Sequence, residues 1–275
     1  MKLNLINREK SDIGYSIFRF PDGEVQMILG EFSRKEVVDI ECRITNAEEL
    51  FVLMQTCDIL NRHGVMFSIS IYYLMSMRMD RVMDFSRPYT LKIVVGILDN
   101  LGAFPISVFC PHSEMSLDLF KMTPVTLIRP NTLVYYGANH FRSYQMILPD
   151  TGAVKRYRYN GDVPNNIIIG EKVRDVDTGK IVSIKIKNPE ALTGEPLLIQ
   201  DDLCDRGGTF IGLAEAVKEI NPEADINIFV CHMVNPKGIK NLSETFNHVW
   251  FTNSYKDWKS HCDQFPDNVT QIDIV

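Results

Sequence analysis

The sequence contains no apolar run that approaches the roughly 20 residues needed to span a membrane. Its first residues, MKLNLINREKSD, become charged too early for a secretory signal peptide. An excess of basic residues is also missing, because 29 lysines and arginines face 35 acidic residues and give a net charge of −6. We therefore expect neither a membrane nor a nucleic acid as partner, since nucleic-acid binding usually needs a basic face.

Closely spaced cysteines are missing as well. The six cysteines lie far apart, at positions 42, 57, 110, 204, 231 and 262, and none belongs to a Cys-x-x-Cys pair. Zinc knuckles and redox motifs are therefore not expected. The spacing favours reduced, mostly buried thiols in a cytoplasmic protein.

The composition that is present, 45% hydrophobic and 23% charged residues, is that of an ordinary soluble globular protein. The 275 residues suffice for one large domain or for two domains of about 130 residues each. Either arrangement is large enough to bury a sizeable core.

Strand-like and helix-like segments alternate along the first half of the chain. Residues 46–64 predict a helix, because Asn46 can cap its N-terminus and Gly64 suits its C-terminus. Residues 66–74 are rich in β-branched and aromatic side chains and predict a strand. The other expected elements are strands at 37–44 and 105–110 and a helix at 89–103. This strand–helix order predicts a parallel sheet with helices packed against it.

The alternation restarts in the second half of the chain. Strands are expected at 144–150, 165–175, 181–188, 196–200, 226–234 and 248–254, and helices at 208–220 and 239–246. We therefore predict an α/β fold with two domains, residues 1–130 and 131–275, in which the last strand can return to the first domain.

The most informative stretch is LLIQDDLCDRGGTF, residues 197–210. It places Asp201, Asp202 and Asp205 at the carboxyl end of an expected strand, where parallel α/β sheets bind ligands. Gly207 and Gly208 then permit a tight loop whose N–H groups converge ahead of a helix N-terminus, an arrangement that suits phosphate. Carboxylates suit hydroxyl groups or a divalent cation instead. A sugar diol beside a phosphate, as in ribose 5-phosphate, meets both requirements; an acidic cap on a buried helix is the simpler alternative.

The same stretch resembles the phosphoribosyl-diphosphate (PRPP) binding motif of type I phosphoribosyltransferases and of ribose-phosphate diphosphokinases, the PRPP synthetases. Further segments resemble only the second family, and they follow in its order: FRFPDGEVQM (18–27), MRMDR (77–81), LPDTGAVKR (148–156) and GEKVRD (170–175). The resemblance covers residues 15–260, whereas a simple phosphoribosyltransferase would explain only the second half. It implies a short, divergent family member with two phosphoribosyltransferase-type domains, each a mainly parallel sheet flanked by helices.

The resemblance also implies an activity. The β,γ-diphosphoryl group of ATP would pass to the anomeric hydroxyl of ribose 5-phosphate, or of a ribose-5-phosphoryl nucleotide such as ADP-ribose, and AMP would leave. Such a reaction belongs to nucleotide biosynthesis or NAD metabolism, and its charged substrates require Mg²⁺. The first domain would bind the adenine side of ATP and the second would carry the ribose-phosphate site and the catalytic loop. The family further implies a homo-oligomer with the ATP site near a subunit interface.

The implied site residues fall into four groups. Lys172 and Arg174 would be catalytic and clamp the transferring diphosphoryl group. Ribose phosphate would be bound by Asp201, Asp202, Asp205, Arg206, Gly207, Gly208 and Thr209. ATP would be bound by Phe20, Asp22, Glu24, Arg78, Asp80 and Arg81, with Phe20 stacking on adenine. His112 and Asp150 would hold the metal ion.

Several of these residues have a structural alternative. Phe20 could be part of the core, and His112 could be a structural histidine. Lys172 and Arg174 could form a solvated hairpin edge, and Arg81 could take part in a surface ion pair.

Three positions depart from the family pattern. Met79 replaces a glutamine near ATP, and the acid expected before His112 is missing. Arg206 replaces a threonine in the phosphate loop and adds a fork of donors suited to phosphate. An acceptor with a second phosphate, such as ADP-ribose, is the hypothesis that this substitution suggests. Two other classes stay open: a type I phosphoribosyltransferase that uses PRPP, and a non-catalytic regulatory homologue.

Overall fold

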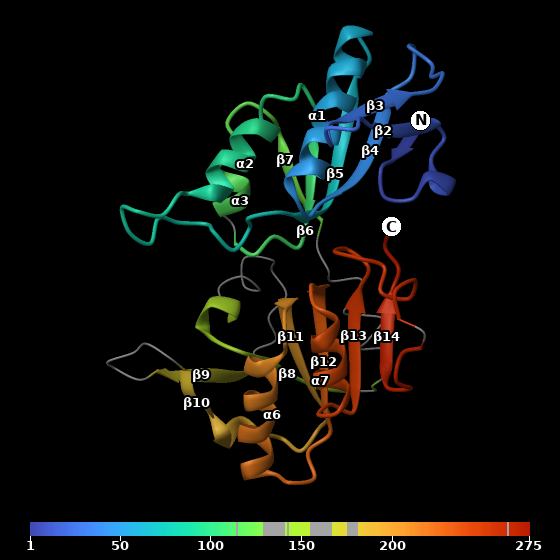
Figure 1. The fold of residues 1–275 in the computed structure, drawn as a ribbon. Helices are drawn as coiled ribbons and strands as arrows, with labels where there is room; N and C mark the ends of the chain where they lie inside the picture. The colour runs from blue at the N-terminus through green and yellow to red at the C-terminus, as the bar shows by residue number, and fades with distance from the viewer. Residues whose placement is uncertain (114, 129–140, 142, 155–166, 175–180, 263) are drawn as a thin grey trace. The chain divides into compact units, whose positions relative to one another are not determined.

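The computed structural model describes the chain apart from residues 114, 129–140, 142, 155–166, 175–180 and 263 (Figure 1). It divides into two compact units, Met1–Ile128 together with Val275, and Arg129–Ile274. The first is called unit 1 and the second unit 2 below, and each is described by itself.

Unit 1 contains a five-stranded parallel sheet in the order β1-β4-β5-β6-β7. Its strands are β1 (Lys2–Asn4), β4 (Val38–Ile44), β5 (Phe67–Leu74), β6 (Ile106–Phe109) and β7 (Val125–Ile128). Its helices are α1 (Ala47–Arg62), α2 (Thr90–Leu98) and α3 (Met115–Asp118), with a 3-10 turn, η1 (Arg8–Lys10), near the start. The parallel sheet with packed helices that the sequence predicts is therefore confirmed.

In β4 the apolar side chains gather on one face of this sheet. Val38 and Ile40 are fully buried in the core of the unit, while Asp39 between them is exposed. Asp39 accepts a hydrogen bond of 2.6 Å from Ser68 on the neighbouring strand. Parallel sheets are usually buried on both faces, so the alternation in β4 and in the first part of β5 indicates that this stretch of the second face is polar.

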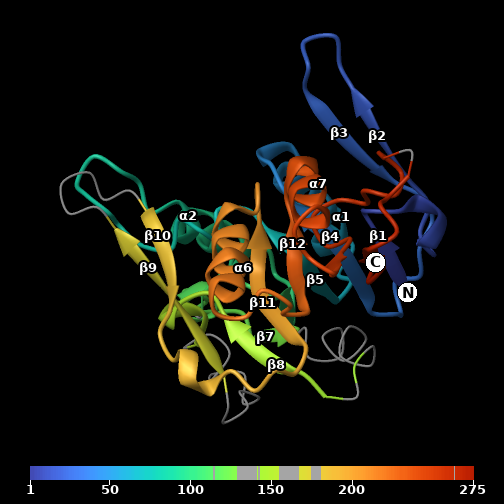
Figure 2. The ribbon, with the colours of Figure 1, turned by 90° about the horizontal axis from the view of Figure 1, so that it is seen from below.

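A two-stranded antiparallel hairpin, β2 (Tyr15–Arg19) and β3 (Val25–Leu29), extends from unit 1 (Figure 2). The pattern of residue types in this segment does not predict it. Gln55 of α1 accepts from Met27 N–H at 2.7 Å and donates to Val25 C=O at 2.9 Å, which satisfies the inner edge of β3. The side chain of a helix thus replaces a third strand along this edge.

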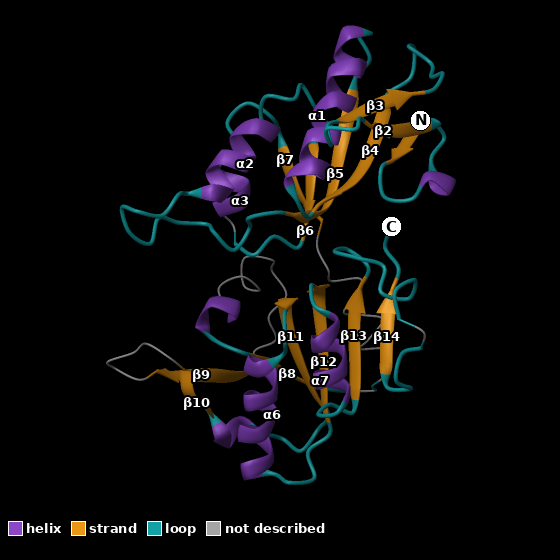
Figure 3. Ribbon diagram, viewed as in Figure 1, coloured by secondary structure: helices purple, strands orange, loops and turns teal. Residues whose placement is uncertain are grey.

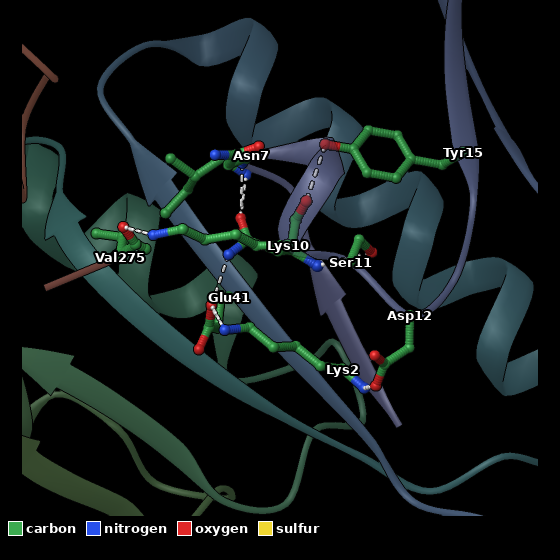
Figure 4. A network of polar contacts seen from close by, with 10 residues as sticks. Lys2, Asn7, Lys10, Ser11, Asp12, Tyr15, Glu41 and Val275 are labelled. Carbon is green, nitrogen blue, oxygen red and sulfur yellow. Dashed lines mark hydrogen bonds and ion pairs between the residues drawn. The ribbon is translucent and has the colours of Figure 1, made fainter.

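A polar network fixes the base of the hairpin (Figure 4). The Tyr15 hydroxyl donates to the carbonyl of Asn4 at 2.9 Å, and Asn4 donates to Glu41 of β4 at 2.7 Å. Lys2 makes an ion pair with the same carboxylate at 2.8 Å. Lys10 donates to the carbonyl of Val275 at 2.6 Å, which brings the last residue to unit 1.

Unit 2 is built on a seven-stranded sheet in the order β10-β9-β8-β11-β12-β13-β14. Its strands are β8 (Gln145–Leu148), β9 (Ile168–Arg174), β10 (Ile181–Ile186), β11 (Leu197–Cys204), β12 (Ile226–Met233), β13 (His248–Thr252) and β14 (Val269–Ile272). All neighbours are parallel except β9 and β10, which form an antiparallel pair. A 3-10 turn, η2 (Pro189–Ala191), precedes β11.

Two helices, α6 (Gly208–Ile220) and α7 (Pro236–Ser243), pack against one face of this sheet (Figure 3). Their side chains Leu213 and Leu242 are fully buried with Ile199 and Ile228 of the central strands. Every residue of β12 is buried. The centre of the second sheet is therefore covered on both faces, as is usual for parallel strands.

Three expectations need correction. β11 continues to Cys204 rather than ending at residue 200, so Asp201 and Asp202 lie within the strand. The last strand, β14, pairs with β13 inside the second sheet and does not return to unit 1. Helix α7 begins at Pro236, three residues before the expected start, because Asn235 caps it and proline suits the first turn.

The cysteines follow the expectation only in part. Cys42, Cys57 and Cys204 are buried free thiols, and Cys262 is a partly exposed one. Cys110 and Cys231 are disulfide-bonded, so the expectation of reduced thiols is wrong for these two positions.

In the part of the chain that is described, no helix is long and apolar enough to cross a membrane.

Candidate functional site

The loop between β11 and α6 presents backbone N–H groups at the start of a helix. Gly207 precedes α6 with φ at +82°, a left-handed conformation that L side chains rarely adopt. No hydrogen-bond partner for the N–H groups of Arg206, Gly208 and Thr209 is found among the described residues. Donors of this kind, together with the positive end of the helix dipole, form a ready site for an anion.

Helix α7 holds this loop from one side. Asn241 donates to the carbonyl of Arg206 at 2.9 Å, and Asn235 donates to the carboxylate of Asp205 at 2.7 Å. A side chain at Gly238 would overlap the carbonyl of Asp205, so the close contact requires glycine. The loop is therefore fixed by contacts that leave its N–H groups available.

Two carboxylates stand at the end of β11, immediately before this loop. Asp202 is buried at 3% exposure, whereas Asp201 is half-buried. The side chain of Asp201 accepts a hydrogen bond of 2.9 Å from the N–H of Asp202. Burial, with the charges of Asp205 and Asp201, raises the pKa of the neighbouring Cys204 thiol to about 12, so Cys204 is no nucleophile at neutral pH.

Lys172 on β9 lies beside Asp150, which follows β8. Its ammonium group is 2.7 Å from Asp150 Oδ2, and both side chains are partly buried. Arg174 ends β9, but its side chain lies outside the described residues. The structure therefore unites the predicted catalytic lysine with a residue predicted to bind metal.

The described ranges contain no group of three or more histidine, cysteine or acidic side chains that could hold a metal ion. Asp201 and Asp202 nevertheless offer carboxylate oxygens beside the predicted phosphate loop. Magnesium is commonly bound by one or two carboxylates together with substrate phosphates. The donor set fits an ion that arrives with its substrate better than one held by the protein alone.

The predicted adenine-binding residues occupy the tip of the β2–β3 hairpin in unit 1. Phe20 is 41% exposed, which excludes a place in the core, and its ring meets that of Phe18 edge to face at 4.8 Å. Gly23 makes the turn with φ at +95°. Asp22 accepts from the N–H of Glu24 at 3.1 Å, so part of its role is to shape the turn.

The residues of unit 1 that are predicted to bind the ATP phosphates or the metal ion follow β5 and β6. Arg81 clasps the buried carboxylate of Asp80 through two hydrogen bonds, at 2.8 and 3.1 Å. Burial alone would raise the pKa of Asp80, but the bonds from Arg81 and the charges of Arg81 and His112 hold it below its usual range. Arg81 thus makes an ion pair, while Arg78 is exposed and has no ion pair in the described part of the chain.

Sequence reasoning missed two parts of this arrangement. Phe18 faces the same side of the hairpin as Phe20, and the period-2 spacing of the two phenylalanines was the available signal. The bracing of the phosphate loop by Asn235 and Asn241 had no such signal, because these residues lie about 30 positions further along the chain.

No model of a protein family matches the chain, but individual proteins do. It is 24% identical over 275 residues to the ribose-phosphate pyrophosphokinase of Pyrococcus abyssi, covering 98% of this chain and 90% of that protein. It is 30% identical over 215 residues to the enzyme of the same name from Vibrio cholerae, and this match covers 74% of this chain and 66% of that protein.

A solved structure is also similar. The crystal structure of phosphoribosylpyrophosphate synthetase from Mycobacterium smegmatis has a TM-score of 0.79 to this chain at 21% sequence identity. The match covers 97% of this chain and 88% of the other. At this level of identity the likeness shows the fold, which is the pair of mainly parallel α/β sheets predicted from the sequence.

Proposed function

Because the chain belongs to the ribose-phosphate pyrophosphokinase family, we propose that it transfers the β,γ-diphosphoryl group of ATP to the anomeric hydroxyl of a ribose 5-phosphate group. AMP is the second product. The observation that carries this proposal is the loop of unit 2, where two carboxylates and a set of available N–H groups lie together between β11 and α6.

The acceptor binds at this loop through two kinds of contact. The N–H groups of Gly208 and Thr209 and the end of α6 hold the 5-phosphate. Asp201 and Asp202 accept hydrogen bonds from the ribose hydroxyl groups. This division follows from charge, because a carboxylate repels phosphate and binds hydroxyl groups well.

The transferring group requires positive charge more than covalent chemistry, because phosphoryl transfer depends on positioning and neutralisation. Lys172 supplies an ammonium group on β9, and Arg174 ends the same strand. Both stabilise the charge that develops on the diphosphoryl oxygens. Magnesium, carried by the phosphates and shared with Asp201 and Asp202, would neutralise further charge; His112 remains a predicted metal ligand of unit 1.

ATP binds through unit 1. Phe20 at the hairpin tip stacks on adenine, and Asp22 and Glu24 accept from its amino group. The ATP phosphates lie beside Arg78, Asp80 and Arg81, and Arg78 supplies the exposed positive charge. The exposed pair of phenylalanine rings supports a site that a neighbouring subunit completes, and hence a homo-oligomer, which we place in the cytoplasm.

The acceptor is either ribose 5-phosphate itself or a ribose-5-phosphoryl nucleotide such as ADP-ribose. Arg206 supports the second, because its exposed side chain stands on the phosphate loop and has no ion pair among the residues described. A guanidinium at this place offers a second phosphate two parallel hydrogen bonds. An ADP-ribose acceptor would connect the reaction to NAD metabolism.

The test is to incubate the purified protein with ATP and Mg²⁺ and with each acceptor, while AMP release and product mass are measured. We expect AMP with one acceptor or both, and a product heavier than the acceptor by one diphosphoryl group. Arg206→Thr should lower turnover with ADP-ribose more than with ribose 5-phosphate. The absence of AMP with either acceptor contradicts the proposed function.

A further inference from the structure

Gln200 is a buried polar residue of β11 to which the sequence motif assigns no role. It is 1% exposed, and neither Oε1 nor Nε2 of its side chain has a hydrogen-bond partner in the part of the chain that is described. An amide that is buried without partners destabilises a fold, because the hydrogen bonds that it makes with water in the unfolded chain are not replaced. An apolar side chain of the same length would avoid this loss.

Other buried glutamines of the same sheet do have partners. Gln145 of β8 is 3% exposed; it accepts from the N–H of Thr193 at 3.2 Å and donates to a backbone carbonyl at 2.6 Å. Gln271 of β14, also 3% exposed, accepts from the N–H of Trp258 at 2.8 Å and donates to two carboxylates. Both side chains connect the sheet to a neighbouring loop. Within the described ranges Gln200 makes no such connection, so support of the fold does not explain it.

The position of Gln200 in the sheet places it beside the acidic pair. β11 lies between β8 and β12 (Figure 1), and Gln200 pairs in register with Phe229 of β12. Successive strand residues point to opposite faces, so Gln200 lies on the same face as Asp202, and Asp201 lies on the other. Two residues of a strand span about 6.6 Å, a distance that the side chain of glutamine can largely bridge. Toward the carboxyl end of the strand, the buried residues on this face therefore change from apolar Leu198 to polar Gln200 and Asp202.

The chemistry of the proposed acceptor supplies the missing partner. Ionised carboxylates such as those of Asp201 and Asp202 only accept hydrogen bonds, so they satisfy the protons of the ribose hydroxyl groups but not the lone pairs of the hydroxyl oxygens. A carboxamide has both an acceptor oxygen and two N–H donors. It can accept from one hydroxyl group of a vicinal diol while it donates to the other.

We propose that Gln200 is a specificity-determining residue of the acceptor site, whose carboxamide binds the 2,3-diol of the ribose together with Asp202. Any opening that admits the diol to Asp202, which is itself 3% exposed, also brings it toward Gln200. This inference rests on the proposed function, in which the acceptor is a ribose 5-phosphate group. It deepens that function by naming the residue through which the site rejects a deoxyribose acceptor.

The first experiment measures stability without any ligand. Methionine resembles glutamine in length and lacks the amide, so Gln200→Met removes the polar group with little change of shape. We expect its melting temperature to equal or exceed that of the wild-type protein, because no hydrogen bond is lost. Gln145→Met is the matched control, and its melting temperature should fall by at least about 3 °C, since its former partners stay buried. A similar fall in both variants overturns the inference.

The second experiment measures acceptor binding by calorimetry, with Mg²⁺ and without ATP. The probes are ribose 5-phosphate and ADP-ribose, each compared with analogues that lack the 2-hydroxyl or the 3-hydroxyl group of the reacting ribose. The wild-type protein should prefer the hydroxylated acceptor. Gln200→Met should reduce this preference about tenfold for at least one of the two hydroxyl groups, the usual effect of one lost hydrogen bond. Gln145→Met should keep the wild-type preference.

Two results of the binding experiment overturn the inference. One is an equal loss of affinity for all three forms of the acceptor, because a residue that only supports the fold would act on them alike. The other is a wild-type preference that Gln200→Met leaves unchanged. Failure of the proposed function gives a different result: ATP and the bound acceptor form no AMP, while the preference for the hydroxyl groups still depends on Gln200. If the wild-type protein binds neither acceptor, both proposals fail.

Discussion

Single residues of the phosphate loop carry conformations that other residues cannot adopt. Gly207 has φ at +82°, and a Cβ atom there would lie 2.8 Å from Leu242 Cδ2 of α7. At Gly208 beside it, nothing lies within 4 Å of the place that a Cβ atom would take, and φ is not positive. A side chain at position 207 would therefore be strained, whereas one at position 208 would fit.

We expect Gly207→Ala to cost about 1–3 kcal/mol of folding free energy, the usual strain of a left-handed position. The loop should shift as well, so the KM for the acceptor should rise at least about tenfold, which corresponds to about 1.4 kcal/mol of lost binding. Gly208→Ala is the control for stability and should change the free energy of unfolding by less than about 0.5 kcal/mol. Urea unfolding and steady-state kinetics measure both effects; equal stability of the two variants contradicts the reasoning.

Phe20 allows a second test at this scale, because its ring is 41% exposed and contributes little to the core. Phe20→Ala should weaken ATP binding by about 1–3 kcal/mol, the usual worth of one base stacked on an aromatic ring. Its melting temperature should stay close to the wild-type value. Phe51→Ala, which removes a similarly exposed ring from α1, is the control and should bind ATP normally in a calorimetric titration.

At the scale of helices and strands, one carboxylate connects the C-terminal end of α2 to the segment before β7. Asp99 accepts from the N–H groups of Lys121, Met122 and Thr123 at 2.8 to 3.1 Å and is only 7% exposed. Burial by itself would raise the pKa of Asp99, but the three N–H groups lower it below its ordinary value. The charged form is therefore the one that stabilises this connection.

A lowered pKa in the folded state gives stability above the unfolded pKa of about 3.9, and this stability is lost as the pH falls through the folded value. Asp99→Asn should destabilise the protein at pH 7 by about 1–3 kcal/mol, because the N–H donors compete for one remaining acceptor. The difference from wild type should shrink below about pH 4. Melting temperatures measured from pH 7 downward test this, and a constant difference argues against it.

For the whole molecule, the predicted ATP residues lie in unit 1 and the predicted acceptor residues in unit 2. If a neighbouring subunit completes each ATP site, Phe20→Ala and Lys172→Ala chains should complement one another when they are expressed together. Mixed oligomers should then turn over faster than either variant alone, because some sites combine two intact halves. A protein that elutes at its monomer mass of 31.5 kDa and shows no complementation contradicts the predicted oligomer.

Local patterns in the sequence are enough to predict most of the helices and strands. The helix α1 follows from its Asn46 cap and its acidic first turn, and in the structure the Asn46 side chain accepts from the N–H of Glu49. The hairpin of β2 and β3 is not predicted, since four of the five residues of β2 are exposed and the strand lacks a regular apolar alternation. Its stability depends on Gln55, which is about 30 residues away.

The motif around Asp201 and Gly207 determined the kind of site, because the chemistry of acids, glycines and a helix start depends on residue types close together in the chain. Tertiary structure decided how those residues are held and which partners they meet. Helix α7 fixes the loop through Asn241, and β9 brings Lys172 to Asp150 across 22 positions. Such contacts depend on strand order and on the close approach at Gly170, which no local pattern encodes.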